Sequence, residues 1–441
     1  MDSKNVIAAI ALSSAVIVLY SLFFIPEQNS INQDLVEKKK IEENSDAPSL
    51  DQKENTIKIS RDEALNQNDR IKFENENIIG SISLKGAAID DLTFKNYKVN
   101  LNDEKRVTLL GPRNIDEGYL VESGFVTNDK NIDIPNSDSI WSVNGNNELT
   151  NQNSVKLSWS NNQGIEFEKE ISLDDKFLFT IKQRVINKTT KKYDFYSYGQ
   201  IIRNSTPDIT DFYILHEGLI ATLDDELIEE DYDDIQEKKF SKVAQKGWLG
   251  IGDKYWITSL IPPQNKEFKT TFDYKNKFRA NFIATKPLEL NENSSIEEEL
   301  KIIVAAKRVE IIDGYAETLN IDKFDLVIDW GFLYFLTKPL WFVLDYFFKI
   351  FGNYGLAIIA VTFCIRLAVF PLANYSFRSM AKMKVLQPEM VRLKELHKDD
   401  KMKLQQAMMA LYKKEKVNPM SGCLPIIPQI FIFFALYKVL F

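Results

Sequence analysis

Three runs of apolar residues along the chain are long enough to cross a lipid bilayer. They are Val6 to Ile25, Tyr354 to Leu372 and Cys423 to Phe441. A helix needs roughly 20 predominantly apolar residues to span the hydrocarbon core. The pattern therefore predicts an N-terminal transmembrane anchor within residues 1–26 and two further transmembrane helices, at 354–372 and 421–441.

The first of these runs has a second interpretation, a cleaved signal peptide. The run is longer than the apolar part of a signal peptide, and no small-residue cleavage motif precedes Pro26. We therefore favour an uncleaved anchor. The residues that follow it, 27–56, are rich in Lys, Glu, Asn and Asp and contain no aromatic residue, which predicts a solvated polar linker.

A different pattern fills the long region 57–318, where short runs alternate between apolar and polar residues. Examples are Gly80 to Leu84, Val155 to Trp159 and Phe177 to Val185, the last of which follows the turn signal Asp174-Asp175. Period-two alternation broken by Asn, Asp and Gly predicts antiparallel strands. So many short strands in one region predict a large all-β domain, a β-sandwich of the supersandwich type.

Residues 319–353 connect this domain to the second apolar run, and Leu333 to Ile350 has a helical pattern rich in aromatic residues. Its charged residues fall on one stripe: Lys338, Asp345 and Lys349. A helix of this kind can lie in the headgroup plane of a membrane. The alternatives are a buried helix or a spanning helix, and we favour the interfacial one because Pro339 and the three charges oppose spanning.

The segment 373–420 has apolar residues at steps of three and four, which predicts a pair of antiparallel helices. Asp400 stands where it can cap the second helix, and Val417 to Pro419 ends that helix. The methionines in this segment suit variable apolar partners, but we expect those in the seam to fill it. The expected seam residues are Met383, Leu386, Met390, Leu393, His397, Leu404, Met408 and Leu411.

Charge assigns these segments to compartments. Residues 373–420 hold eleven Lys/Arg and five acidic residues, whereas residues 27–353 carry a net charge of −16 within a total of −8. Short basic loops stay in the cytoplasm, so the hairpin at 373–420 is expected inside. The N-terminus is then cytoplasmic and the large domain periplasmic. The expected fold class is a multi-domain, multi-pass inner-membrane protein with a partial α-helical transmembrane bundle, a periplasmic all-β supersandwich and a cytoplasmic helical hairpin.

The large domain offers little catalytic chemistry. His216 is its one histidine, and the two cysteines, Cys364 and Cys423, lie outside it. The acidic clusters Asp224 to Glu226 and Glu229 to Asp231 can attract a cation, but solvated loops are the commoner explanation. Because metal sites and nucleophilic triads usually need more histidine or cysteine than this, we expect no enzyme, no cofactor and no metal.

Arg366 is the one charge in the second apolar run. An arginine at mid-bilayer costs about +2.5 to +3.5 kcal/mol, so such residues usually face protein or water. Thr362 lies four residues earlier on the same helix face, and Gln429 is a polar residue of the third run. Together they suggest a shared hydrated cavity. Snorkelling of Arg366 to the cytoplasmic surface, and a purely structural pairing, are the alternatives.

Several motifs resemble the YidC/Oxa/Alb family of membrane protein insertases, in the Gram-negative form that has a large periplasmic domain. The resemblance is specific from about residue 325 onward and weaker in the sandwich, where only Gly247 to Gly250 and Lys254 to Trp256 carry it. The motifs are Ile328 to Phe332, Thr337 to Pro339, Gly352 to Ile358, Arg366 with Phe370 to Leu372, Ser379 to Met383, Leu386 to Pro388, Ala410 to Lys413, Val417 to Pro419 and Gly422 to Pro425.

The resemblance implies a mechanism and a set of site residues. In the family, five core helices enclose a hydrophilic groove that is open to the cytoplasm and to lipid but closed on the outer side. The groove arginine, here Arg366, attracts polar or acidic parts of a nascent segment, which then moves into lipid along an apolar face. Thr362 and Gln429 are similar to groove positions. Cys423, Pro425 and Phe433 are similar to family positions that contact the substrate.

The resemblance also implies partners. They are nascent membrane proteins, the lipid bilayer, the Sec translocon beside the sandwich, and the ribosome or signal recognition particle machinery at the basic hairpin, with no nucleic-acid substrate. Two departures stand out. The order Pro428-Gln429-Ile430 replaces the usual Gln-x-Pro of the family. Three family core helices would follow Phe441, so we expect a C-terminally truncated chain whose groove is complete only in the full-length protein.

Two other classes of function compete with an insertase. A membrane-anchored periplasmic carbohydrate-binding or sensor protein would have its activity in 57–318 and would not need Arg366. A transporter or channel subunit would need more intramembrane polar residues than Arg366, Thr362 and Gln429. We therefore expect a membrane protein insertase or chaperone that acts alone or with the Sec translocon.

Overall fold

The computed structural model describes residues 59–100, 102–207, 215–398, 400–415 and 426–441. The expected anchor at 1–26 and the linker at 27–56 lie outside these residues. Two candidate site residues, Cys423 and Pro425, also lie outside them.

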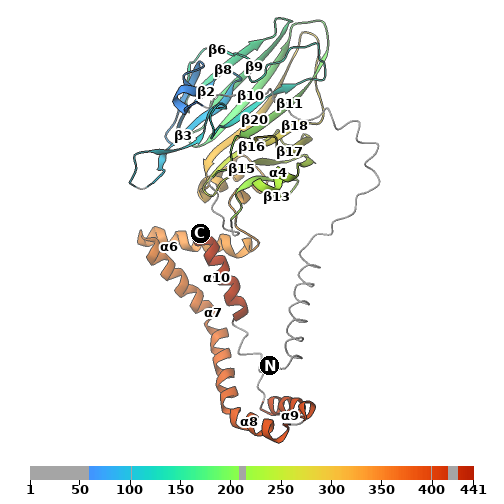
Figure 1. Cartoon of the computed structure of the whole chain (residues 1–441). Coiled ribbons are helices and arrows are strands. Elements are labelled where there is room, and N and C mark those ends of the chain that lie inside the picture. Colours follow the sequence, from blue (N-terminus) through green and yellow to red (C-terminus); the bar gives the residue numbers. More distant parts are fainter. Residues whose placement is uncertain (1–58, 101, 208–214, 399, 416–425) are drawn as a thin grey trace, which may run out of the picture. The chain divides into compact units, whose positions relative to one another are not determined.

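The predicted large β-sandwich is confirmed in the described part of the chain, where it consists of two layered sheets (Figure 1). The first sheet has eleven strands and the second has nine. All strand pairs are antiparallel except β1 with β7, which are parallel.

The first sheet follows a path of nine strands, with β4 (Arg106–Leu110) beside β3 and β19 (Leu288–Leu290) beside β11. The path is β14 (Phe240–Ala244), β17 (Phe268–Tyr274), β18 (Phe278–Ala284), β11 (Tyr193–Arg203), β5 (Tyr119–Val126), β3 (Ala88–Lys98), β2 (Ile78–Ser83), β1 (Arg70–Glu74) and β7 (Glu148–Leu149).

The second sheet crosses from the C-terminal to the N-terminal half of the domain. Its order is β13 (Glu226–Asp231), β12 (Gly218–Leu223), β15 (Gly247–Gly252), β16 (Trp256–Ile261), β20 (Ser295–Ala306), β10 (Leu178–Asn187), β9 (Ile165–Leu173), β8 (Ser154–Ser160) and β6 (Ser142–Asn144).

Strand β9 shows how the alternating pattern forms the core. Its odd-numbered residues from Ile165 to Leu173 are buried, and the residues between them are half-buried. The turn predicted before the next strand is present, because the Asp174 carboxylate accepts hydrogen bonds from the backbone N–H groups of Lys176 and Leu178, both at 2.9 Å. Every second side chain of β9 thus points into the core, because successive side chains of a strand point to opposite faces of the sheet.

In the described part of this domain, four short helical segments accompany the sheets: α3 (Arg61–Leu65), α4 (Tyr232–Glu237), α5 (Val309–Thr318) and the 3-10 helix η2 (Phe324–Val327). Helix α5 is fixed to the sandwich by Tyr315, whose hydroxyl donates to Asp174 at 2.7 Å and accepts from the Phe177 N–H at 2.8 Å. The buried side chain of Ile312 adds apolar contact with the core. The sandwich therefore includes α5 and η2 as parts of one core.

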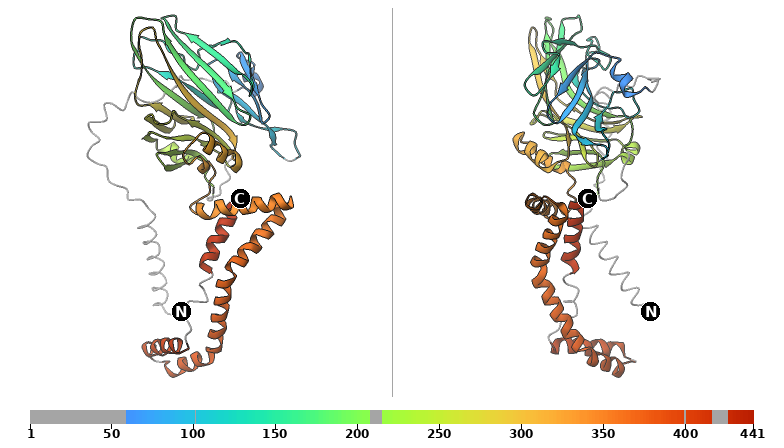
Figure 2. Two further views of the ribbon diagram at one scale, coloured as in Figure 1. Left: turned by 180° about the vertical axis from the view of Figure 1, so that it is seen from behind. Right: turned by 90° about the vertical axis from the view of Figure 1, so that its left-hand side faces the viewer.

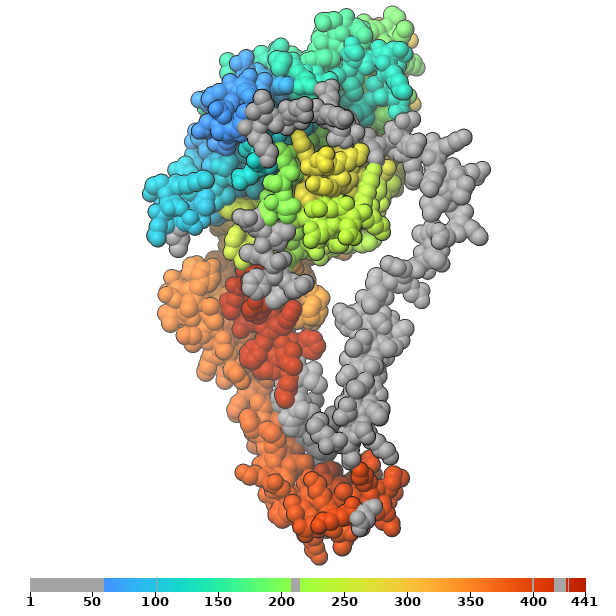
Figure 3. Space-filling model, in the orientation of Figure 1, coloured from blue at the N-terminus to red at the C-terminus, as the bar shows by residue number. Residues whose placement is uncertain are grey.

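Helices α6 (Tyr334–Phe351), α7 (Tyr354–Val385) and α10 (Ile426–Leu440) follow the sandwich. Gly352, at φ 64°, ends α6 in the left-handed region, and the Asn353 side chain caps α7 by accepting from the Leu356 N–H at 3.2 Å. Figures 2 and 3 show α6, α7 and α10 beside one another. A small apolar cluster joins them: Leu344, Ala357, Val361 and Leu436.

Within the described residues, α7 is the one helix long and apolar enough to cross a membrane, and the apolar section of α10, Pro428–Leu440, is shorter. Helix α7 does not end at Leu372, where the apolar run ends, but continues past Pro371 to Val385. The hydropathy pattern marks the end of the apolar residues, whereas backbone hydrogen bonding continues through polar ones.

Helices α8 (Gln387–Leu396) and α9 (Lys401–Lys414) pack against each other after α7 (Figure 1). The predicted cap is confirmed, because the Asp400 carboxylate accepts from the Lys403 N–H at 3.0 Å. All eight seam residues expected from the spacing are half-buried, while neighbours such as Leu396 and Met402 are exposed. Tyr412 also donates to the Met390 sulfur at 3.9 Å across the seam.

Candidate functional site

Arg366 lies on α7 with its side chain exposed, among apolar neighbours such as Phe363 and Leu367 that are exposed as well. The guanidinium carbon is 5.9 Å from the centre of the Phe433 ring on α10. This distance is at the outer limit of a cation–π contact. The structure thus brings two of the candidate residues together from two different helices.

Thr362 is one turn before Arg366 on the same face of α7 and is half-buried. Its hydroxyl donates to the Ile358 carbonyl at 2.8 Å. Because this bond uses the donor of the hydroxyl within its own helix, the oxygen lone pairs remain the polar feature that Thr362 can offer to another group.

Gln429 is half-buried on α10, and its side-chain Nε2 is buried without a hydrogen-bond partner in the described part of the chain. An unpaired buried donor costs about 1–3 kcal/mol. The structure does not join Gln429 to Arg366 by a hydrogen bond. A water molecule or a polar group of another chain would satisfy this amide.

The surfaces around these polar groups are apolar and largely uncovered by protein. In the most apolar 18-residue stretch of α7, 11% of the residues are buried. Exposed apolar side chains line both helices: Ile359, Phe363, Leu367, Phe370, Ile430, Phe431 and Phe434. Such a surface suits a hydrocarbon solvent, in which apolar side chains are stable and an arginine is not.

The predicted polar stripe of α6 faces α5 and η2 of the sandwich. Lys338 donates to Asp325 at 2.8 Å and to Asp313 at 3.2 Å, and the Tyr334 hydroxyl donates to Asp325 at 2.6 Å. Burial by itself would raise the pKa of Asp325, but the hydrogen bonds from Lys338 and Tyr334 hold it below its usual value. Lys349 adds an exposed contact to Glu310 at 3.2 Å.

With the charged stripe directed to the sandwich, the aromatic residues of α6 cover its other sides. Phe335, Phe342 and Tyr346 are exposed. The helix predicted for Leu333 to Ile350 is therefore present with its two faces separated. This separation is the property that a helix in a membrane interface requires.

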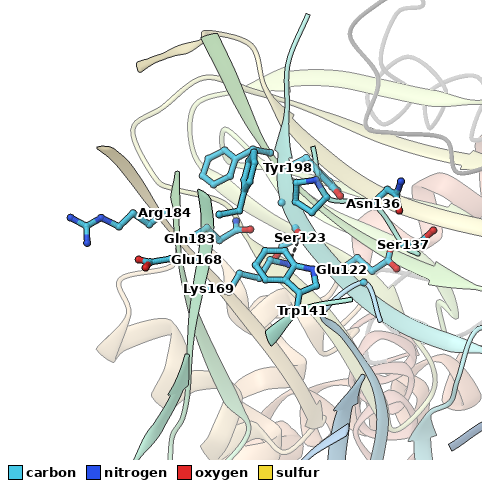
Figure 4. A pocket seen from close by; sticks show the side chains of 15 residues that line it. Glu122, Ser123, Asn136, Ser137, Trp141, Glu168, Lys169, Gln183, Arg184 and Tyr198 are labelled. Atoms are coloured by element: carbon cyan, nitrogen blue, oxygen red, sulfur yellow. Dashed lines mark hydrogen bonds between the residues drawn. The ribbon is translucent and has the colours of Figure 1, made fainter. Parts of the chain in front are cut away.

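A small pocket lies inside the sandwich around Lys169, an inward residue of β9 (Figure 4). The Lys169 ammonium donates to the Ser123 carbonyl at 2.6 Å and lies 5.0 Å from the centre of the Trp141 ring. Burial lowers the pKa of Lys169 to about 8, against the opposing charge of Glu122. Figure 4 shows Glu168 and Arg184 pointing away from this group.

This pocket has room for one water-sized group. Its volume is about 20 Å³, and one water needs roughly 10–15 Å³ of such space. Gln183 Oε1 and Trp141 Nε1 are both buried and have no hydrogen-bond partner among the described residues. The pocket is therefore a small gap within the sandwich core, and a sugar does not fit in it.

The first acidic cluster considered for a cation is already engaged with protein groups. Lys242 pairs with Glu226 at 2.5 Å, and Lys246 pairs with Asp225 at 3.1 Å. The Asp224 carboxylate accepts from backbone N–H groups of the next turn. The solvated-loop interpretation therefore fits these residues.

Sequence reasoning did not find the ion pair between Asp329, in the loop before α6, and Lys438, in the last turn of α10, whose charged atoms are 2.8 Å apart. In the sequence, Asp329 stands within the motif Ile328 to Phe332, and Lys438 lies near the end of the third apolar run. The two residues are 109 positions apart in the chain, so no local spacing connects them.

Comparison with known proteins covers nearly the whole described chain. Residues 70–343 match the model of the YidC periplasmic domain, and residues 346–441 match that of the 60Kd inner membrane protein family. The membrane protein insertase YidC of Pelagibacter ubique is 71% identical over 441 residues, which are 100% of this chain and 79% of that protein.

A second relative, the membrane protein insertase YidC of Rickettsia felis, is 41% identical over 99% of this chain and 79% of its own length. A solved structure of an active YidC insertase covers 84% of this chain and 71% of its own, with 15% identity and a TM-score of 0.27. On the sequence matches, the chain belongs to the YidC family of membrane protein insertases, inner-membrane proteins with a periplasmic domain.

Proposed function

We propose that this insertase inserts its substrates through a hydrated recess centred on Arg366. The observation that carries the proposal is an exposed guanidinium on the apolar helix α7, 5.9 Å from the Phe433 ring of α10. The Gln429 amide on α10 supports it, since its buried Nε2 has no hydrogen-bond partner among the described residues. Thr362, Cys423 and Pro425 complete the proposed substrate groove.

The recess would act first by electrostatic attraction. Two unit charges 4 Å apart attract by about 4 kcal/mol at an effective dielectric constant of 20, and by about 1 kcal/mol in bulk water. Arg366 in a recess of intermediate polarity therefore attracts an acidic or polar part of a nascent chain. Water in the recess also shortens the apolar distance that a polar tail has to cross.

Release would follow along the apolar surfaces of the same helices. Phe363 and Leu367 are exposed next to Arg366 on α7, and Ile430 is exposed on α10. The free energy of a hydrophobic segment falls when the segment leaves water for such a surface and for lipid. The substrate can thus be held at its polar part while its apolar part moves into the membrane.

The proposed topology follows from the charge pattern. We propose a multi-pass protein with a cytoplasmic N-terminus, a periplasmic domain at 57–318, an interfacial helix within 319–353, transmembrane helices at 1–26, 354–372 and 421–441, and a cytoplasmic hairpin at 373–420. The excess of eleven basic over five acidic residues in the hairpin favours ribosome or signal recognition particle partners. The sandwich is proposed to contact the Sec translocon.

Complementation of insertase-depleted cells with the full-length gene tests the groove. We expect Arg366→Lys to support growth and insertion, because it keeps the charge, and Arg366→Ala to fail for substrates with acidic tails. Arg308→Ala is the control, since it removes an exposed arginine outside the apolar runs and the basic hairpin. Normal insertion of every substrate by Arg366→Ala would refute the charged-recess mechanism.

A further inference from the structure

The ion pair between Asp329 and Lys438 is nearly enclosed by protein. The exposed fractions of the two side chains are 14% for Asp329 and 6% for Lys438. Exposed ion pairs contribute little, but an enclosed pair has lost the water that would otherwise stabilise each charge. Each of these two charges is therefore stabilised by the other.

The Asp329 carboxylate joins three parts of the chain. Oδ2 accepts from Lys438 at 2.8 Å and from the His216 backbone N–H at 2.9 Å, while Oδ1 accepts from the Gly331 N–H at 2.9 Å. These bonds connect the segment before β12, the turn before α6 and the last turn of α10. Charge-assisted hydrogen bonds of this kind have defined directions and distances.

Gly331 gives this turn a left-handed backbone conformation next to the Lys438 side chain. Its φ of 68° lies in the left-handed region, and a Cβ at this position would be 3.4 Å from Cε of Lys438. A side chain at position 331 would be strained in this conformation. The turn and the lysine stem therefore pack together as one unit.

Further charges surround the pair. Lys307 is half-buried, and the loss of water around its ammonium lowers its pKa to about 8, while Asp253, Asp329, Glu217 and Glu229 act in the opposite direction. Burial raises the pKa of Glu229, opposed by His216 and Lys438. Loss of Asp329 would leave Lys438 and Lys307 with less compensating negative charge, so the carboxylate holds the arrangement together.

Lys438 is on the helix that carries two proposed groove residues. Phe433 and Gln429 precede it by five and nine positions, which at 1.5 Å per residue are about 7.5 and 13.5 Å along the axis of α10. The apolar cluster of Leu436 with α6 and α7 attracts α10 but fixes its rotation and depth weakly, because apolar contact is non-directional.

We infer that Asp329 and Lys438 are positioning residues for insertion: their ion pair fixes α10 against the periplasmic domain and so places Phe433 beside Arg366. The inference rests on the proposed groove, and it adds the periplasmic domain as the part that sets the geometry of the groove. Neither residue needs to touch the substrate.

The first test measures the position of α10 in the full-length protein reconstituted in lipid. Spin labels at Tyr346→Cys on α6 and Ile430→Cys on α10, in a background with Cys364→Ser and Cys423→Ser, report the distance between the helices. We expect one narrow distance distribution with the native pair and with Lys438→Arg, and a broad or shifted one with Lys438→Met or Asp329→Asn. Lys349→Met, which removes an exposed lysine of α6, is the control that keeps the distribution narrow.

The second test measures insertion in depleted cells. Lys438→Met and Asp329→Asn should each lower the insertion of acidic-tailed substrates roughly fivefold or more, Lys438→Arg should restore it, and the double variant should be no worse than either single one. Equal protein levels separate positioning from a loss of folding. If Lys438→Met leaves the distance distribution unchanged, the inference is overturned, whatever the result for Arg366→Ala. If Lys438→Met changes the distribution but Arg366→Ala still inserts every substrate, the positioning role stands and only the proposed charged groove is refuted.

Discussion

At the residue scale, three lysines show how surroundings decide what one side chain does. Lys169 is 3% exposed in the sandwich core, Lys438 is 6% exposed against Asp329, and Lys349 is 62% exposed at the surface of α6. Burial of Lys169 disfavours its charged form. The first lysine therefore reduces the free energy of unfolding, the second depends on its partner, and the third contributes little.

The buried Lys169 predicts a specific dependence of stability on pH. Its pKa falls from 10.5 in the unfolded chain to about 8 in the folded protein, so between these values the unfolded state binds more protons and stability rises with pH. We expect Lys169→Met to be more stable than the native protein at pH 7, by a few kcal/mol at most (~1.36 kcal/mol for each pKa unit).

The measurement is the difference in melting temperature of the sandwich between the two proteins, taken from pH 7 to pH 10.5. The difference should shrink as the pH rises, because Lys169 becomes neutral in the folded state. Lys182→Met, on an exposed position of β10, should show no such trend. A difference that stays constant with pH would mean that the Lys169 ammonium is charged throughout the range.

At the scale of elements, local spacing patterns in the sequence predicted the strands and helices well. They did not predict the contacts between segments that are distant in the sequence. Alternation identified β2, β8 and β10, the aromatic run identified α6, and the steps of three and four identified the seam of α8 and α9. These signals are local because each side chain direction repeats along its own backbone.

The misses at this scale also have physical reasons. The apolar run ends at Leu372 while α7 continues to Val385, because helical hydrogen bonds tolerate polar residues. The stripe with Lys338 marked a charged face of α6, but its partners Asp313 and Asp325 lie on other elements. For the candidate site, the face shared by Thr362 and Arg366 follows from helical spacing, whereas the approach of Phe433 depends on tertiary packing.

The seam between α8 and α9 predicts different effects for two leucines of the same helix. Leu393 is half-buried in the seam, while Leu396 is 72% exposed. We expect Leu393→Ala to destabilise the hairpin by about 1–2 kcal/mol, less than a fully buried leucine would, and Leu396→Ala to change it by less than about 0.5 kcal/mol. Hydrogen exchange of the α9 amides measures this, and equal protection in both variants would contradict a packed seam.

At the scale of the whole molecule, polar contacts between distant segments join the sandwich to the apolar helices. Tyr315 fixes α5 to the sheets, Lys338 fixes α6 to α5 and η2, and Lys438 fixes α10 to Asp329. Each joint is made of directed polar contacts. The apolar surfaces of α7 and α10 remain uncovered beside them, available to lipid and to substrate.

Replacement of Lys338 tests the joint between the sandwich and α6. Lys338→Met leaves Asp325 and Asp313 without their shared cation, so α6 should exchange its amide hydrogens faster while β9 and β10 stay protected. Lys349→Met should have a smaller effect, because its pairs are exposed. Unchanged exchange of α6 in Lys338→Met would show that apolar contacts alone hold the helix.

The separation of Asp329 and Lys438 along the chain also imposes an order in time. Ribosomes add roughly 5–20 residues per second, and the 109 positions between the two residues therefore take roughly 5–20 seconds to make at that speed. During this interval the Asp329 carboxylate has no Lys438 to pair with. The periplasmic domain is therefore synthesised before α10, and the ion pair that connects the two can form only after Lys438 has been added to the chain.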